Sequence, residues 1–291
     1  MLPRERFKYS AIVDRAPLKL PDGARVVVST VVNVENWAFD RPMPRQAMTT
    51  PAGAPALPDV PNWAWHEYGM RVGFWRLKAA LDGFGIKATT SINASVCLDY
   101  PRIARAVLDA GWEFMGHGFE QKTMHALDDE RAAIRKAIAT IRDFTGKAPR
   151  GWLGPGLTET DRTLDILAEE GIEYICDWVM DEQPVEMRTT AGPVVMVPYS
   201  VELNDIAIMV IQQHEARVLY ERTMAQFERL YQEGKESARV LALCVHPYIS
   251  GVPHRIDQFE RIFEDLTKRP GVLFWTNEQI LDWYRDLGGE T

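Results

Sequence analysis

Short apolar runs alternate with amphipathic stretches along most of this chain. The first run, Ala24–Val32, is continuous and rich in valine, which is typical of a strand buried on both faces. Arg71–Phe84 has apolar residues at helical spacing and ends before Gly85, a good C-terminal cap. The same reasoning predicts strands at 88–92, 112–115, 149–153, 173–176, 194–197, 240–245 and 272–275, helices at 101–110, 129–145, 160–170, 215–233 and 256–268, and a last helix opened by a capping box of Thr276 and Gln279.

This alternation predicts parallel strands joined by crossover helices. We count about seven or eight such units, which favours an α/β fold built as a distorted, closed or nearly closed (β/α) barrel. The alternative, a doubly wound sheet, usually carries a GxGxxG fingerprint, and none follows a predicted strand. We expect a single domain, with an N-terminal extension at 1–23 and the barrel at 24–291.

The stretch from Arg41 to Pro61 interrupts the alternation. It holds six of the chain's 18 prolines, and proline can continue neither the interior of a helix nor a central strand. Long loops inside compact domains are usually lids, contacts between subunits or disordered segments, and an ordered surface excursion is an equal alternative. We expect a Pro-rich lid or contact loop over 38–66.

Composition narrows the class of protein. The chain has 291 residues, of which 46% are hydrophobic and 25% charged, as in an ordinary soluble protein. Its net charge of −8 disfavours nucleic acid and anionic membrane surfaces as partners. The charged start lacks a signal peptide's apolar run, no run has membrane-spanning length, and three scattered cysteines form no CxxC pair. We expect a cytoplasmic homo-oligomer, a dimer or tetramer, without nucleic-acid or membrane partners.

Candidate chemistry lies where the predicted strands end, since the active sites of α/β barrels gather at the C-terminal edge of the sheet. Groups able to act as acid, base or ligand recur at this edge, which favours a functional site over scattered polar residues. His66, which follows Trp63 and Trp65, is a further candidate near the Pro-rich loop. The residues that follow predicted strands are Glu35, Asn36, His117, Gln121, Asp177, Trp178 and His246. The strand that starts near Arg150 runs into Trp152, so these two residues are further candidates.

The order of these motifs resembles the polysaccharide deacetylase superfamily, the NodB homology domain, over roughly 26–284. The stretches EYGMRVGFWRL (67–77) and HPYISGVPHRI (246–256) resemble one branch, which includes metal-independent allantoinases and cyclic-imide hydrolases besides some peptidoglycan deacetylases. The family's Asp-Asp pair is matched by Glu35-Asn36, its His-x-x-x-His by His117 and Gln121, its Arg-x-Pro loop by Arg150 through Pro155, its Asp-Trp-like motif by Asp177-Trp178, and its last histidine by His246.

The resemblance also indicates whether a metal is needed. In the deacetylases a divalent metal is held by the second Asp and the two His residues. Those positions read Asn36, His117 and Gln121 here, which leaves one good zinc ligand, because neutral amides bind zinc poorly. We therefore expect no metal cofactor, with a zinc site as the alternative.

Without a metal, amide hydrolysis needs an activated water, a proton donor for the leaving nitrogen and stabilisation of an oxyanion. The resemblance implies that Glu35 is the base that activates water. We expect His246 to protonate the leaving nitrogen, with Asp177 orienting its imidazole. His117 is expected to bond the substrate or position Glu35. The expected substrate-binding residues are Asn36, Gln121, Arg150, Trp152 and Trp178.

These residues favour an amidohydrolase acting on carbon–nitrogen bonds other than peptide bonds. The expected substrate is a small cyclic amide, either an imide or a ureide such as succinimide, hydantoin or allantoin. Such rings have better leaving groups than ordinary acetamides, so they can open without a Lewis acid. The first alternative is a polysaccharide or peptidoglycan N-deacetylase. The second is a catalytically silent barrel that binds a small ligand.

Overall fold

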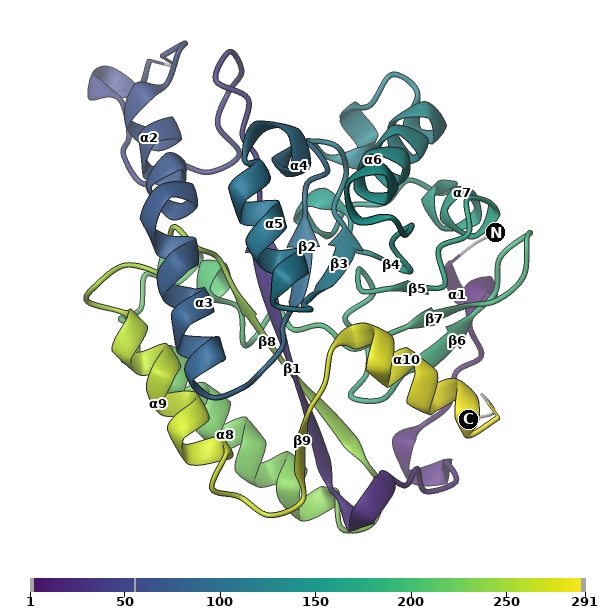
Figure 1. Cartoon of the computed structure of the whole chain (residues 1–291). Helices are drawn as coiled ribbons and strands as arrows, with labels where there is room; N and C mark the ends of the chain where they lie inside the picture. Colours follow the sequence, from purple (N-terminus) through teal and green to yellow (C-terminus); the bar gives the residue numbers. More distant parts are fainter. Residues whose placement is uncertain (1–2, 55, 289–291) are drawn as a thin grey trace.

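The computed structural model describes residues 3–54 and 56–288, and it confirms the predicted barrel (Figure 1). One curled sheet has the order β6-β7-β5-β4-β3-β2-β1-β8, and β9 pairs with β1. In this part of the chain every ladder is parallel except that between β6 and β7. The strands are β1 (Val26–Val34), β2 (Thr89–Ile92), β3 (Glu113–Gly116), β4 (Gly151–Trp152), β5 (Tyr174–Ile175), β6 (Val185–Met187), β7 (Val194–Met196), β8 (Arg239–Val245) and β9 (Val272–Phe274).

Side chains of β1 alternate between two cores, as a buried strand requires. Its nine residues are all buried. Val26 and Val28 pack in the outer core, between the sheet and the surrounding helices. Val27 and Val31 pack in the inner core, which fills the barrel together with residues of the last helix. Glu35, the next residue after β1, continues this alternation on the side of Val27 and Val31, toward the barrel interior.

Helices surround the sheet in Figure 1, as the crossover pattern predicts. Helix α6 shows how local residues set where a helix begins and ends. Asp129 caps its first turn by accepting a hydrogen bond from Ala132 N, and Gly146 ends it in the left-handed region. No helix of residues 3–54 and 56–288 has the length and apolar character that crossing a bilayer requires. The helices are α1 (Pro3–Arg6), α2 (Val60–Tyr68), α3 (Phe74–Gly83), α4 (Val96–Asp99), α5 (Pro101–Asp109), α6 (Glu130–Thr145), α7 (Thr163–Glu169), α8 (Arg217–Glu233), α9 (Ile256–Leu266) and α10 (Asn277–Asp286).

The Pro-rich segment ends earlier than predicted, because α2 begins at Val60. Pro61 lies in the first turn of this helix, where a proline costs no hydrogen bond. Helix α2, a π-helical turn at Gly69–Gly73 and α3 follow one another without a break. The sequence pattern predicts only the second half of this helical segment, and it misses β6, which has three residues.

Irregular chain fills the gap between β8 and the other end of the sheet. Val240 N of β8 donates to Glu182 O at 2.9 Å, and Cys244 N donates to Leu203 O at 2.9 Å. The segment containing Leu203 ends in a π-helical turn, Ile206–Ile211. It lies across the open edge of the barrel and brings further polar side chains close to the end of β8.

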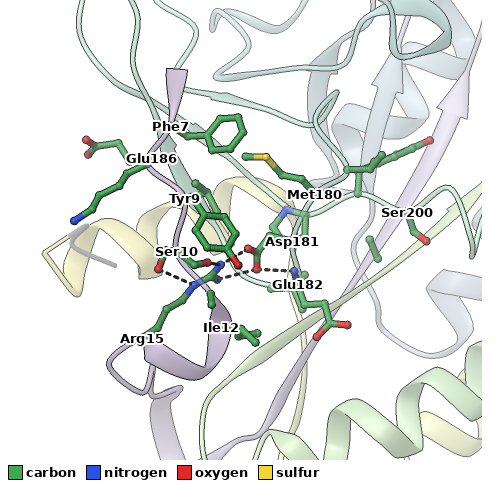
Figure 2. A pocket seen from close by; sticks show the side chains of 18 of the residues that line it. Phe7, Tyr9, Ser10, Ile12, Arg15, Met180, Asp181, Glu182, Glu186 and Ser200 are labelled. Atoms are coloured by element: carbon green, nitrogen blue, oxygen red, sulfur yellow. Dashed lines mark hydrogen bonds and ion pairs between the residues drawn. The ribbon is translucent and has the colours of Figure 1, made fainter. Parts of the chain in front are cut away.

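A groove of 1710 Å³ lies beside this gap, between the N-terminal segment and the chain around β6 (Figure 2). Arg15 ties the two walls together: its guanidinium donates to both carboxylate oxygens of Asp181, at 2.9 and 2.6 Å. Tyr9, Met180 and Val201 expose apolar surface along the groove. The predicted catalytic residues do not line it.

Candidate active site

Three predicted residues meet inside the C-terminal mouth of the barrel. Glu35 follows β1, His117 follows β3 and His246 follows β8, and each continues the inward-facing positions of its strand. Their exposed fractions are 2%, 3% and 3%. His246 Nε2 lies 3.6 Å from Glu35 Oε1. The structure therefore places a carboxylate and an imidazole side by side in a site closed to bulk water.

The Glu35 carboxylate is held by three hydrogen-bond donors. Its Oε2 accepts from Trp37 Nε1 at 2.7 Å and from the Tyr248 hydroxyl at 2.9 Å. Its Oε1 accepts from Gln121 Nε2 at 2.9 Å. The buried His66 ring also hydrogen-bonds to the Glu35 carbonyl oxygen, with its Nε2 at 2.7 Å, and stacks on Trp37. Both the side chain and the backbone of Glu35 are thus fixed in place.

Positive charge keeps Glu35 ionised despite its burial. Burial alone raises the pKa of this carboxyl, but Arg45, His246 and His117, with the hydrogen bond from Trp37, lower it to about 2. Arg45 belongs to the Pro-rich loop, and its guanidinium lies 3.7 Å from Glu35 Oε1. At neutral pH the site therefore holds a carboxylate anion with a fixed cation beside it.

Asp205 orients His246, in place of the predicted Asp177. Its Oδ1 faces His246 Nδ1 at 2.7 Å, and its Oδ2 accepts from the backbone N of His246, also at 2.7 Å. The Ser250 hydroxyl donates to the same Oδ2. With Nδ1–H bonded to a carboxylate, the lone pair or proton on Nε2 points toward Glu35.

Asp177 lies on the other side of the sheet, so the prediction that it orients His246 is wrong. Tyr174 and Cys176 of this strand pack inside the barrel, so the next side chain points outward. The Asp177 carboxylate accepts a hydrogen bond from Gly154 N at 2.7 Å. Burial raises its pKa well above the usual range, and the neighbouring Glu159 carboxyl raises it further.

His117 and Gln121 supply unfilled hydrogen-bond acceptors. The Nδ1 of His117 lies 2.6 Å from the Leu153 carbonyl oxygen, so Nδ1 carries the proton and Nε2 keeps a lone pair. Burial is the main reason that the pKa of His117 falls to about 4, which leaves the ring neutral at pH 7. Gln121 Oε1 is buried without a hydrogen-bond partner. Both groups suit a ligand that carries N–H donors.

The donor set does not fit a divalent metal. Asn36 faces away from the site, because its amide donates to Ser95 Oγ and Asp99 Oδ2. Gln121 turns its amide N–H toward Glu35, and Arg45 places a cation where a metal would be repelled. Among residues 3–54 and 56–288, no group of three or more His, Cys, Asp or Glu side chains could hold a metal ion. The described side chains around Glu35 thus supply acids and bases rather than a set of metal ligands.

Three predicted substrate-binding residues lie elsewhere. Trp152 is fully buried in the outer core. Trp178 donates to Glu159 Oε1 at 3.0 Å and packs against Phe7. Arg150 precedes β4, so it lies at the opposite edge of the sheet, where it pairs with Glu173 and Asp282. Asn36, as described above, also points outward. Gln121 alone among the five contacts the carboxylate of Glu35.

The sequence pattern did not indicate three residues of this site, Arg45, Asp205 and Tyr248. Trp37 and Tyr248 stand two positions after Glu35 and His246, but both lie beyond the ends of β1 and β8, where the period of a strand no longer applies. Asp205 and Arg45 come from irregular segments. No periodic pattern places such residues in space.

Glycines allow the helical segment to press against the loop that carries His246. A Cβ on Gly73 would lie 2.0 Å from the Pro247 carbonyl oxygen, and one on Gly69 would lie 2.7 Å from Tyr248 N. Both glycines belong to the π-helical turn, a feature that often occurs at functional sites. The stretches 67–77 and 246–256, which the sequence analysis singles out, are thus two sides of one contact.

Comparisons with known proteins agree with this architecture. Residues 66–175 match the family described as "Polysaccharide deacetylase". A peptidoglycan deacetylase from Helicobacter pylori is 22% identical over 248 residues, covering 72% of this chain and 83% of the relative. The crystal structure of the PuuE allantoinase is 25% identical with a TM-score of 0.86, covering 99% of both chains. That of a probable polysaccharide deacetylase from Pseudomonas aeruginosa PAO1 is 24% identical with a TM-score of 0.85, covering 96% of this chain and 97% of the other. These comparisons support the predicted resemblance to the polysaccharide deacetylase (NodB homology) superfamily and to its allantoinase-like branch.

Proposed function

We propose that this hydrolase of carbon–nitrogen bonds opens the ring of a small cyclic amide, an imide or a ureide, without a metal. The observation that carries the proposal is the buried pair of Glu35 and His246, with Asp205 behind the imidazole. These groups supply a base and an acid within reach of one bond. The similarity to a solved allantoinase over nearly the whole chain supports a ring-opening reaction.

The unfilled acceptors support a ring that carries N–H groups. Imides and ureides alternate N–H donors with carbonyl acceptors. His117 Nε2 and Gln121 Oε1 are placed to accept from such donors, and a buried acceptor without a partner strongly favours a ligand that supplies one. The burial of Glu35, His117 and His246 suits a small substrate better than a polymer.

The proposed reaction proceeds in two steps. Glu35 takes a proton from water as the water oxygen bonds to the ring carbonyl carbon, which gives a tetrahedral oxyanion. The oxyanion then collapses, the carbon–nitrogen bond breaks, and the imidazolium of His246 protonates the leaving nitrogen. Transfer of the proton from Glu35 to His246, across the 3.6 Å that separate them, restores both groups. The product is a ring-opened carboxylic acid with a terminal amide or urea.

An N-deacetylase is the second candidate, and the sequence relative from Helicobacter pylori supports it. Deacetylation of an N-acetyl sugar also hydrolyses a bond between a carbonyl carbon and a nitrogen. The donor set argues against it, because an ordinary acetamide has a poor leaving group and this site does not fit a Lewis acid. The two candidates differ in their need for a metal and in the size of their substrates.

The deciding experiment is a ring-opening assay on succinimide, hydantoin, dihydrouracil and allantoin, run beside an N-acetylglucosamine oligomer. We expect turnover of at least one ring and none of the oligomer. Glu35→Gln keeps the shape of the side chain but removes the proton acceptor, so turnover should fall by about 10²- to 10⁴-fold. Activity should survive extensive chelation, with well under one divalent metal per chain by elemental analysis. Stoichiometric metal whose removal stops turnover and whose return restores it would refute the proposal and favour the deacetylase.

A further inference from the structure

Arg45 stands out among the charged residues around the site because its donors are unused. Its side chain is 21% exposed and reaches Glu35 Oε1 at 3.7 Å, which is too long for a hydrogen bond. Its guanidinium makes no hydrogen bond to residues 3–54 and 56–288. An arginine has five N–H donors, and because no acceptor in the described part of the chain takes those of Arg45, they are open to a ligand.

The loop around Arg45 is tied down on both sides, so the guanidinium is held at the site by structure. Arg41 pairs with Glu120, and Met43 is buried in the outer core. On the other side, the backbone N–H groups of residues 47 and 48 donate to the side-chain oxygen of the fully buried Asn62, at 2.7 and 2.9 Å. The Pro-rich segment thus works as a fixed support for one cation.

We propose that Arg45 is a catalytic residue with two states. In the free enzyme its guanidinium is the counter-ion of Glu35. In the substrate complex its N–H groups donate to the ring carbonyl oxygen that water attacks, which draws the positive charge from Glu35 onto the developing oxyanion. This inference rests on the proposed function and assigns the Pro-rich loop to the catalytic site.

In the free enzyme the charge of Arg45 makes Glu35 a weaker base, and movement of the guanidinium to the substrate would reverse this effect. A carboxylate with a pKa near 2 is a weak base, and general-base catalysis is most efficient when the pKa lies near the working pH. After burial, Arg45 is the leading influence on the pKa of Glu35. If the substrate carbonyl draws the guanidinium away, Glu35 becomes a stronger base only when a substrate is present.

The free-enzyme state can be tested without any substrate. The titration of the Glu35 carboxyl is followed by carbon-13 NMR, and its signal is assigned by its loss in Glu35→Gln. Arg45→Met should raise the pKa of Glu35 by about 1 to 3. Arg41→Met is the matched control, because it removes a cation from the same loop but one that pairs with Glu120. Equal titration of Glu35 in the wild type and Arg45→Met would overturn the counter-ion role.

The bound state is tested by calorimetry with hydantoin as the probe, in the unreactive Glu35→Gln background. Adding Arg45→Met should weaken binding by about 10- to 100-fold, the effect of losing a hydrogen bond from a charged donor. Adding Arg41→Met should leave it unchanged, and Arg45→Lys should restore part of the loss, because lysine keeps the charge without the planar fork. Equal binding with and without Arg45, or no binding of hydantoin to Glu35→Gln, overturns the carbonyl contact. Full turnover by Glu35→Gln would instead contradict the proposed function, so the two failures are distinguishable.

Discussion

A single carboxylate fixes the orientation of the His246 ring. Asp205 receives both the ring Nδ1–H and the backbone N–H of this histidine. It is fully buried and makes its third contact with Ser250. An orienting carboxylate fixes the tautomer and stabilises the imidazolium, so its effect on catalysis passes through the histidine.

We therefore predict strongly non-additive losses at these two positions. His246→Ala should abolish the acid and lower kcat/KM by about 10²- to 10⁴-fold. Asp205→Asn should cause a smaller loss, and the double variant should be no worse than His246→Ala alone. Asp177→Asn is the control, because that carboxyl contacts Gly154 on the outer side of the sheet. Additive losses in this double-mutant cycle would show that Asp205 acts on its own.

The residues that the sequence identified correctly are those that continue a strand on its inward side. Glu35, His117 and His246 share this position. Asp177 has the right chemistry and follows a strand, but it stands one residue out of phase, and a shift of one residue turns a side chain to the opposite face. The true orienting residue, Asp205, lies in an irregular segment that reaches the site only through the fold.

At the scale of elements, one contact sets the position of the loop after β8. The π-helical turn at Gly69–Gly73 approaches the backbone of this loop so closely that Gly73 has no room for a Cβ. Strand periods and helix caps predict most elements of this chain, because most are regular and long. They do not predict a π-turn, since its extra residue breaks the helical period.

Substitution of the tight glycine should therefore damage the site from a distance. Gly73→Ala must push the Pro247 carbonyl away, which displaces His246 and Tyr248. We expect a loss of about 1–3 kcal/mol in the free energy of unfolding, as overpacking usually costs, together with a large fall in kcat. Gly83→Ala, at the end of α3, meets nothing within 4 Å and should be neutral or slightly stabilising. Equal thermal midpoints and rates for the two variants would contradict this contact.

At the scale of the whole molecule, both ends of the barrel contain polar residues. One end forms the candidate active site, and the other forms a buried hydrogen-bond network. The C-terminal mouth carries Glu35 and its partners. The opposite end, at the start of β2 and β3, is closed by α10 and is called the floor of the barrel here. Ser29 and Asn277 hydrogen-bond inside the barrel at 2.5 Å, and Asn277 N donates to Thr89 Oγ1. The barrel itself could be predicted from alternating strands and helices. This polar floor could not, because a strand pattern does not show which buried polar residues will meet.

The floor contains a buried carboxyl, Glu113, that should make stability depend on pH. It accepts hydrogen bonds from Thr89, Tyr174 and the backbone N of Glu278 at the start of α10. Burial is the main reason that its pKa rises to about 7, whereas an unfolded chain has a pKa near 4.3. A carboxyl with a raised pKa favours folding below its unfolded pKa, and that contribution is lost as the pH rises through 7.

We therefore predict that the native protein loses stability between pH 5 and pH 8 through this one group, by up to about 3 kcal/mol. Glu113→Gln keeps the shape and an acceptor oxygen but cannot ionise, so its free energy of unfolding should fall less over the same range. Urea unfolding at several pH values gives the free energy of unfolding against pH for the wild type and for Glu113→Gln. Glu186→Gln, at an exposed position of β6, is the control for the loss of one carboxylate. Parallel curves for the wild type and Glu113→Gln would mean that Glu113 is ionised in the folded protein throughout this range, and that the barrel floor tolerates a buried charge.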